Sequence, residues 1–295
     1  MNKILILAAL LVSTNLFANP VNILSSFSIL GDVSKELGGE RVKVITLIGA
    51  DQDAHTYQLQ SQDVKKIQSA KLIIMNGLGF ERADIRRAVQ NSGKKIVNAT
   101  AGIKALPIAP HEHHGEQHNH GAYDPHVWHD PILMQTYSRN ITNALISIDP
   151  QGKEYYLNRL KDFQTKLNQL HVWSQSQFQM VPVTKRKAMT AHDSFAYLGN
   201  RYKIKFYSPQ GVSTHDAASA ATIASLIQQI KREQIKALLI EKMVNPRIVQ
   251  QIAKETKVNI KGTLYADALS TRGSSQNYWG LMRHNVSTLT NSMKY

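Results

Sequence analysis

The chain has 295 residues, 42% of them hydrophobic, so it can bury one large core or two ordinary ones and is not expected to be disordered. The absence of cysteine excludes a disulfide framework and a zinc–thiolate site, so a tight metal site would need His, Asp or Glu ligands. The net charge of +14 is spread through helical segments, and we interpret it as a solvated basic surface, the alternative being a docking patch for anionic lipid or an acidic transporter face.

The first 18 residues are built like a cleavable secretory signal. One lysine precedes an apolar run from Ile4 to Val12, and polar residues and the small residue Ala18 follow it. Because this run is too short for a convincing membrane span, we predict a signal peptide over residues 1–18, the alternative being a buried first helix or an uncleaved anchor. With no cysteine for lipid attachment, we expect a periplasmic protein with no membrane anchor and no nucleic-acid partner.

Residues 19–148 alternate short β-branched runs with amphipathic stretches. The expected strands are VNILSSF, VKVITLIG, KLIIMNG and KIVNAT, and helices follow the first three. Strand followed by helix at this spacing is typical of parallel βαβ units. We therefore predict an N-terminal α/β lobe that includes a histidine-rich loop at 111–121 and ends in a long helix over DPHVWHDPILMQTYSRNITNALISI.

A single long helix is predicted next. Apolar residues recur at spacings of four, three, four and three, which puts them in one stripe: Tyr156, Leu160, Phe163, Leu167 and Leu170. A helix of roughly thirty residues from Gln151 to Val181 would be about 45 Å long, and Pro182 marks its end. Because this length exceeds a small lobe, we predict a connecting helix over 149–182, the alternative being a helix packed within one large domain.

Residues 183–295 repeat the alternation, and each half of the chain supplies about four βα units. The expected fold class is α/β, with two lobes of parallel sheet flanked by helices and joined by one long helix. Ligands of open parallel sheets bind beyond the carboxyl ends of the strands. We therefore expect the functional site in the cleft between the lobes, where two sets of strand ends face each other.

Seven of the twelve histidines fall between residues 111 and 129, in two segments of different kind. The first segment has no apolar residue and is expected to be a loop; its histidines are His111, His113, His114, His118 and His120. Imidazoles in such a tract bind Zn²⁺, Cu²⁺ or Ni²⁺ with little selectivity. Ordering a loop costs about 1–2 kcal/mol per residue, so we interpret it as an accessory metal collector or sensor, the alternative being an inert polar loop.

The second segment, DPHVWHDP, is stiffer than the first. Pro125 and Pro131 restrict its backbone, and Asp130 is placed to cap the helix that follows. A preorganised histidine here, His126 or His129, is expected to be a better metal ligand than any histidine of the loop.

Three further candidate ligands lie at predicted strand ends. His55 follows the strand VKVITLIG, before a helix that we expect Ser61 to cap. His192 follows RKAMT, and Asp267 follows VNIKGTLYA. Each residue alone would be read as an ordinary cap or core residue. With a histidine of DPHVWHDP they make three imidazoles and one carboxylate facing one cleft, which is about the set that tetrahedral Zn²⁺ requires.

These residues resemble the metal-specific solute-binding proteins of bacterial ABC transporters, in particular the zinc-uptake (ZnuA-like) branch. The resemblance runs over essentially the whole mature chain, and its most specific motif is DPHVW followed by DP. The segments TYQLQSQD, HDSFAYLGNRY and YADALS stand in the order that the family shows. The resemblance implies two α/β lobes joined by one long rigid helix, and we expect a monomer whose partner is the ABC transporter permease in the inner membrane.

The resemblance also implies the metal ligands, which carry over position by position as His55, His126, His192 and Asp267. His129 falls where relatives usually have another residue, so we expect it outside the ligand set. Manganese-binding relatives have glutamate at the third position, so a histidine there favours Zn²⁺. Zinc relatives often have glutamate just before the first histidine, and Ala54 stands there instead, so the fourth donor is expected to be the aspartate, with water as the alternative. Glu241 is expected either to line the cleft or to support it.

We therefore predict a component of a zinc importer that is not an enzyme and carries Zn²⁺ as cargo to the permease. The alternatives are a manganese or iron carrier of the same class and a periplasmic zinc hydrolase. The sequence has no HExxH, no GxSxG and no identifiable general base beside the four donors, which disfavours the hydrolase. Affinity is expected to fall as pH drops through about 6.5, where imidazole protonates.

Overall fold

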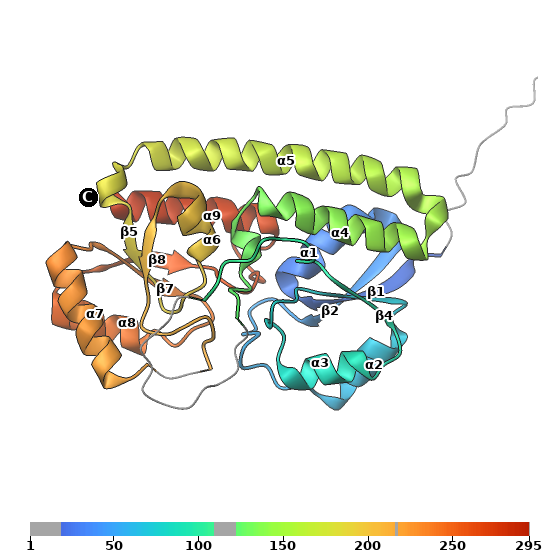
Figure 1. The fold of residues 1–295 in the computed structure, drawn as a ribbon, viewed down its shortest axis with the longest axis horizontal. Coiled ribbons are helices and arrows are strands. Elements are labelled where there is room, and N and C mark those ends of the chain that lie inside the picture. The colour runs from blue at the N-terminus through green and yellow to red at the C-terminus, as the bar shows by residue number, and fades with distance from the viewer. Residues whose placement is uncertain (1–18, 109–121, 216–217, 295) are drawn as a thin grey trace, which may run out of the picture.

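The computed structural model describes residues 19–108, 122–215 and 218–294. They form two four-stranded parallel sheets that lie side by side, with helices packed around them and one long helix running across both (Figure 1). The fold class predicted from the sequence is therefore confirmed. The predicted signal peptide and the histidine-rich loop lie outside the described residues.

The first sheet has the strand order β2-β1-β3-β4, and every neighbouring pair is parallel. Its strands are β1 Val21–Phe27, β2 Val42–Ile48, β3 Leu72–Met75 and β4 Lys95–Asn98. Its helices are α1 Ser28–Gly38, α2 Ser61–Ser69, α3 Ala83–Gln90 and α4 Leu133–Ile148. Helices α1 and α4 lie on one side of the sheet and α2 and α3 on the other (Figure 1). Because both faces are covered, β3 and the last five residues of β1 are buried without alternation, as is usual in parallel sheets.

The second sheet repeats this pattern with the order β6-β5-β7-β8, again all parallel. Its strands are β5 Lys187–Met189, β6 Lys205–Tyr207, β7 Ala237–Glu241 and β8 Ile260–Leu264. Its helices are α6 Ala196–Tyr202, α7 Ala220–Glu233, α8 Arg247–Thr256 and α9 Tyr278–Met293. Apolar residues of α7 and α8 form a small core with β7, whereas α9 packs against β8 and β7 and lies alongside the long helix (Figure 1).

The long helix, α5, spans Lys153–Gln179 and has 27 residues. It begins two residues after Gln151 and ends two residues before Val181, the bounds expected for the helix, and lies within the predicted connecting segment 149–182. A 3-10 turn at Pro150–Gly152 precedes the helix, and the helix ends before the chain reaches Pro182. The five apolar residues of the predicted stripe are all buried, and they pack α5 against α1, α4 and α9. One apolar face thus joins a helix of about 40 Å to elements of both halves.

Two local expectations are corrected by the structure. The segment DPHVWHDP is not part of α4: a 3-10 turn covers Val127–His129, and the helix begins at Leu133. The expected cap is present, because Asp130 Oδ1 accepts the backbone N–H of Ile132 at 2.8 Å. At the start of α2 the cap is Gln60 rather than Ser61, since Gln60 exchanges hydrogen bonds with Asp63 in a capping box.

One hydrophobic core runs through both halves of the molecule. Trp128 lies at its centre, fully buried, and its indole N–H donates to the carbonyl of Ala266 at 2.9 Å. Tyr278 of α9 donates its hydroxyl to the Trp128 carbonyl at 3.0 Å. The two sheets are therefore packed together beneath the cleft, and are not two bodies joined by a helix alone.

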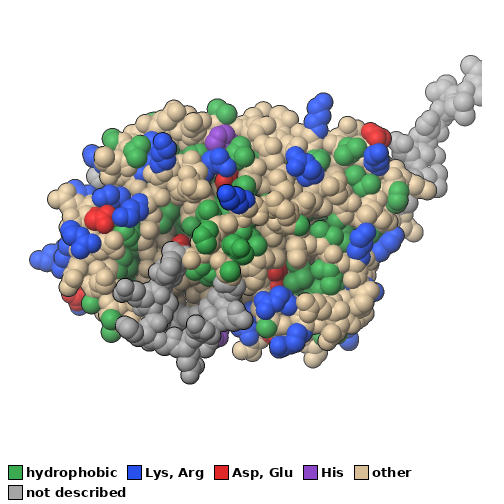
Figure 2. All heavy atoms as spheres, in the orientation of Figure 1, with side chains coloured by type: hydrophobic (Ala, Val, Ile, Leu, Met, Phe, Trp, Pro, Cys, Tyr) green, Lys and Arg blue, Asp and Glu red, His purple; other side chains and the backbone are tan. Residues whose placement is uncertain are grey.

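The basic residues are distributed over the surface. On the face drawn in Figure 2, lysine and arginine side chains are scattered over both halves, with few acidic side chains among them. Within the described part of the chain, no helix combines the length and the hydropathy that a membrane crossing requires.

Candidate metal centre

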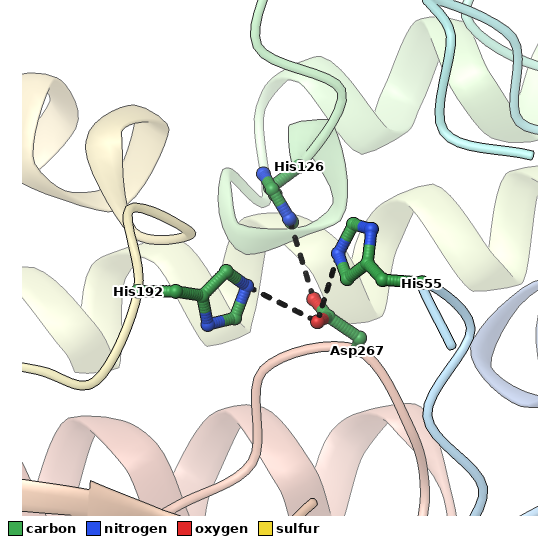
Figure 3. Close-up of side chains that lie close together, drawn as sticks. All are labelled: His55, His126, His192 and Asp267. Atoms are coloured by element: carbon green, nitrogen blue, oxygen red, sulfur yellow. Dashed lines mark ion pairs between the residues drawn. The ribbon is translucent and has the colours of Figure 1, made fainter. Parts of the chain in front are cut away.

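Four side chains from both halves of the chain converge at one point: His55, His126, His192 and Asp267 (Figure 3). Each offers one ligand atom, and these atoms all lie within 4.8 Å of one another. All four residues are buried, with at most 7% of any of them exposed. The structure therefore brings together the four residues that the sequence analysis named.

Three of the four residues sit in loops that follow strands. His55 lies in the loop after β2, His192 follows β5, and Asp267 follows β8. These positions agree with the expectation that the site gathers at the carboxyl ends of parallel strands. Two of the three loops belong to the second sheet and one to the first.

His126 differs from the other three in its position relative to the strands. It follows no strand directly, since a long connection separates it from β4. Instead, Asn76 at the end of β3 donates its side-chain amide to the carbonyl of Pro125 at 3.0 Å. This hydrogen bond ties the segment DPHVW to the same edge of the first sheet.

The three Nε2 atoms all face the carboxylate of Asp267. His55 Nε2 lies 3.3 Å and His192 Nε2 lies 3.2 Å from Asp267 Oδ2, and His126 Nε2 lies 3.4 Å from Oδ1. The three Nε2 atoms and Asp267 Oδ1 are buried and make no hydrogen bond. Tetrahedral coordination with bonds of about 2.0–2.1 Å has edges of about 3.3–3.4 Å, so these separations suit a single small cation.

Aromatic residues form the apolar wall of the site. The ring of Phe80 lies edge-on to His55, with centroids 5.4 Å apart, and Trp128 lies 5.2 Å from His126 in the same manner. Phe80 and Trp128 also contact each other at 4.9 Å. This packing restricts the imidazole rings and keeps water away from the donors, which strengthens electrostatic interactions inside the site.

Two further carboxylates lie behind the histidines. Asp124 Oδ1 is 2.7 Å from His126 Nδ1, and Glu241 Oε2 is 2.5 Å from His192 Nδ1. Glu241 therefore supports a histidine and does not belong to the four converging donors, which answers the alternative left open by the sequence. Asp124 was not singled out by sequence reasoning, although its position two residues before His126 was a usable signal.

The charges in the site influence one another strongly. Burial raises the pKa of Asp267, but His192, His55 and His126 outweigh it and hold that pKa well below its usual value. Burial lowers the pKa of His192, but Glu241 and Asp267 outweigh it and raise that pKa well above the usual value. The site is therefore built around an ionised carboxylate that attracts positive charge.

His129 has a different environment, although it is equally buried. Its ring packs on Phe195, with centroids 4.5 Å apart, and it is not among the converging donors. Burial lowers its pKa to about 3, so the ring stays neutral. The expectation that it lies outside the ligand set agrees with this geometry. The histidine-rich loop, His111 to His120, lies outside the described residues, and its accessory role stays a prediction.

Comparisons with known proteins place the chain in one family. Residues 23–292 match the family model described as zinc-uptake complex component A, periplasmic. The manganese-binding lipoprotein MntA of Bacillus subtilis is 30% identical over 281 residues, covering 93% of this chain and 90% of the relative. The manganese-bound periplasmic metal-binding protein of Candidatus Liberibacter asiaticus has a TM-score of 0.82 and 27% identity, covering 92% of this chain and 99% of that one.

A further solved structure, the periplasmic zinc-binding protein TroA from Treponema pallidum, has a TM-score of 0.84 at 24% identity and covers 94% of this chain and 100% of that one, which is evidence for the fold alone. The family match spans nearly every described residue and includes all four converging side chains. The chain therefore belongs to the family of zinc-uptake complex component A, the metal-binding components of ABC importers.

Proposed function

We propose that this protein captures Zn²⁺ in the periplasm and delivers it to the membrane permease of an ABC importer, with His55, His126, His192 and Asp267 as its ligands. The observation that carries the proposal is the set of buried donor atoms that face one point without hydrogen bonds. Leaving such atoms unpaired costs about 1–3 kcal/mol each, and a bound cation would remove that cost.

The donor set supports zinc as the cargo. Three imidazole nitrogens and one carboxylate oxygen are a common zinc set, whereas Mn²⁺ prefers oxygen ligands. Manganese is the second candidate, because a relative 30% identical to this chain is named as manganese-binding. That relative supports a divalent metal ion as the cargo. The ligand chemistry of this chain favours zinc among such ions.

The choice of metal can be tested on protein purified from its native compartment. Native mass spectrometry with elemental analysis is expected to find one tightly held zinc per chain. Competition between Zn²⁺ and Mn²⁺ for the metal-free protein is expected to favour zinc. Recovery of manganese alone, with no displacement by zinc, would identify a manganese carrier instead.

The rival of a periplasmic zinc hydrolase finds little support in the site. Four protein donors would close the coordination sphere and leave no position for an activated water. Asp124 and Glu241, the carboxylates behind His126 and His192, are engaged by histidines and by backbone N–H groups. Ester or peptide hydrolysis by the purified zinc-loaded protein, lost on His192→Ala, would favour the rival.

We propose that delivery depends on small changes at the loops rather than on a wide opening of the cleft. The shared core and α5 join the two halves, which restrains their relative movement. Metal binding would neutralise the negative charge of Asp267 and order the loops that carry the ligands. The permease would recognise this altered surface. The proposal includes the division of the chain predicted from the sequence. It comprises a signal peptide over 1–18, lobes over 19–148 and 183–295, a connecting segment over 149–182 and the accessory loop.

A further inference from the structure

Two carboxylates outside the donor set hold two of the candidate ligands in the same way. Asp124 Oδ1 accepts the backbone N–H of His126 at 2.8 Å and lies 2.7 Å from Nδ1 of its ring. Glu241 accepts the backbone N–H of His192 at 3.0 Å with Oε1 and lies 2.5 Å from the ring Nδ1 with Oε2. Each carboxylate therefore holds the main chain and the ring of one histidine at the same time.

This arrangement decides which ring nitrogen is free. An ionised carboxylate can only accept hydrogen bonds, so the nitrogen that faces it must carry a proton. The proton on Nδ1 leaves Nε2 as the nitrogen whose lone pair a metal can bind, in place of the second proton that a charged ring would carry there. Nε2 is the atom that points to Asp267 in both His126 and His192 (Figure 3).

His55 is held by a related but incomplete arrangement. Asp53, like Asp124, stands two residues before its histidine, and its Oδ1 accepts the backbone N–H of His55 at 2.8 Å. Its other oxygen accepts the hydroxyl of Thr214 at 2.7 Å, from the second half of the chain. Asp53 therefore fixes the loop that carries His55. Its second oxygen binds Thr214 and not the ring of His55.

We propose that Asp124 and Glu241 are positioning residues that preset Nε2 of His126 and His192 for the metal and that favour Zn²⁺ over Mn²⁺. This inference rests on the proposed function. A carboxylate behind an imidazole fixes the ring and makes its lone pair more basic, which strengthens a bond to a nitrogen-preferring cation. The two carboxylates come from different halves of the chain, so each half supplies one preset imidazole.

Two pairs of variants separate charge from hydrogen bonding. Asp124→Asn and Glu241→Gln keep an oxygen that can accept from Nδ1–H but lose the charge, whereas Asp124→Ala and Glu241→Ala lose both. Affinity for Zn²⁺ alone and for Mn²⁺ alone is measured on the full mature chain by competition with a chelator. We expect a loss of about 10–100-fold for zinc, larger in the Ala variants, and a smaller loss for manganese.

A second measurement identifies the coordinating nitrogen directly. In the zinc-loaded wild type, ¹⁵N NMR of the histidine rings is expected to show coordination through Nε2 and a protected Nδ1–H in His126 and His192. That protection is expected to persist in the Asn and Gln variants and to disappear in the Ala variants. A residue with only a structural role would change stability without changing this signal.

Asp149→Asn provides the matched control. This partly buried carboxylate accepts hydrogen bonds from Arg41 and Tyr156 near the start of α5, away from the four donors. The substitution Asp149→Asn is expected to lower the stability of the fold and to leave zinc affinity unchanged. Zinc affinity within twofold of wild type in Asp124→Ala and Glu241→Ala, or coordination through Nδ1, would overturn the inference and leave the proposed function standing. A wild type that binds neither metal would overturn both.

Discussion

Asp51 and Thr271 are hydrogen-bonded to each other between the two halves of the chain, although 220 residues separate them in the sequence. Thr271 donates its backbone N–H to Asp51 Oδ2 at 2.8 Å, and Ser270 donates its hydroxyl to Oδ1 at 3.0 Å. The Asp51 N–H in turn donates to the carbonyl of Leu269 at 2.9 Å. The loop that carries His55 is thereby tied to the loop that carries Asp267.

This link predicts that Asp51→Ala weakens metal binding without touching a ligand. Without the carboxylate, the His55 loop loses its attachment to the opposite loop. The free-energy cost of ordering the His55 loop then reduces the net binding energy of the metal. We expect zinc affinity to fall about tenfold, mainly through faster dissociation. Chelator-triggered release in a stopped-flow instrument measures this rate. Asp162→Ala, at an exposed position of α5, is the control and should release zinc as the wild type does.

The ligand set predicts unequal effects for the two groups of histidines. His126→Ala removes a buried donor and should lower zinc affinity by more than about 100-fold, because outer partners alone are worth about 10–100-fold. Deletion of residues 111–120 should change the affinity of the four-donor site much less, since three imidazoles and one carboxylate already make up a tetrahedral zinc set. A competition titration compares the variants, and equal losses would contradict the division into a principal site and an accessory loop.

The Arg41–Asp149 pair predicts a pH-dependent contribution to stability. Arg41 donates two hydrogen bonds to Asp149, at 2.7 and 2.8 Å, and their side chains are 14% and 12% exposed. The Arg41 guanidinium lowers the pKa of Asp149 below its usual value. The carboxylate therefore stabilises the fold at pH values above about 3.9, the unfolded pKa, and this contribution is lost as pH falls through the folded pKa.

Asp149→Asn accordingly should reduce the free energy of unfolding by about 1.5–3 kcal/mol at neutral pH. The difference from wild type should shrink below about pH 4, where the wild-type carboxylate also begins to protonate. Urea unfolding of metal-free protein at several pH values measures it. A difference that stays constant down to low pH would show that charge on Asp149 is not the cause.

The buried stripe of α5 predicts that this helix is a main source of stability. Phe163 is 1% exposed and packs its ring on Trp279 of α9, with centroids 4.9 Å apart. Phe163→Ala should cost about 3–5 kcal/mol, from lost burial and the cavity left behind. Val172, on the same helix, is 63% exposed, and Val172→Ala should change stability by less than about 0.5 kcal/mol. Equal effects in thermal or urea unfolding would contradict this packing of α5.

Much of the fold could be predicted from the sequence because its signals are local. The spacing of apolar residues in Tyr156 to Leu170 puts them on one face of a helix whatever lies opposite, and that helix is present. The ends were less predictable, since the turn at Pro150–Gly152 and the capping box at Gln60 depend on details of the surrounding chain. The predicted strand ends indicated His55, His192 and Asp267, the resemblance to a known family selected His126 over His129, and the structure brings these four together.

By itself, the sequence determined the chemistry on offer: no thiolate, many imidazoles, and parallel strands that end near His55, His192 and Asp267. The residues alone left His126 and His129 as equal candidates, and only the tertiary structure decided which atoms face the common point. His126 and His129 lie in the same short turn and are equally buried, yet one turns its Nε2 to Asp267 and the other packs on an aromatic ring. The physical reason is that ring orientation is set by non-local partners. Glu241 reaches His192 from 49 residues away, and no periodicity in the chain records such a contact.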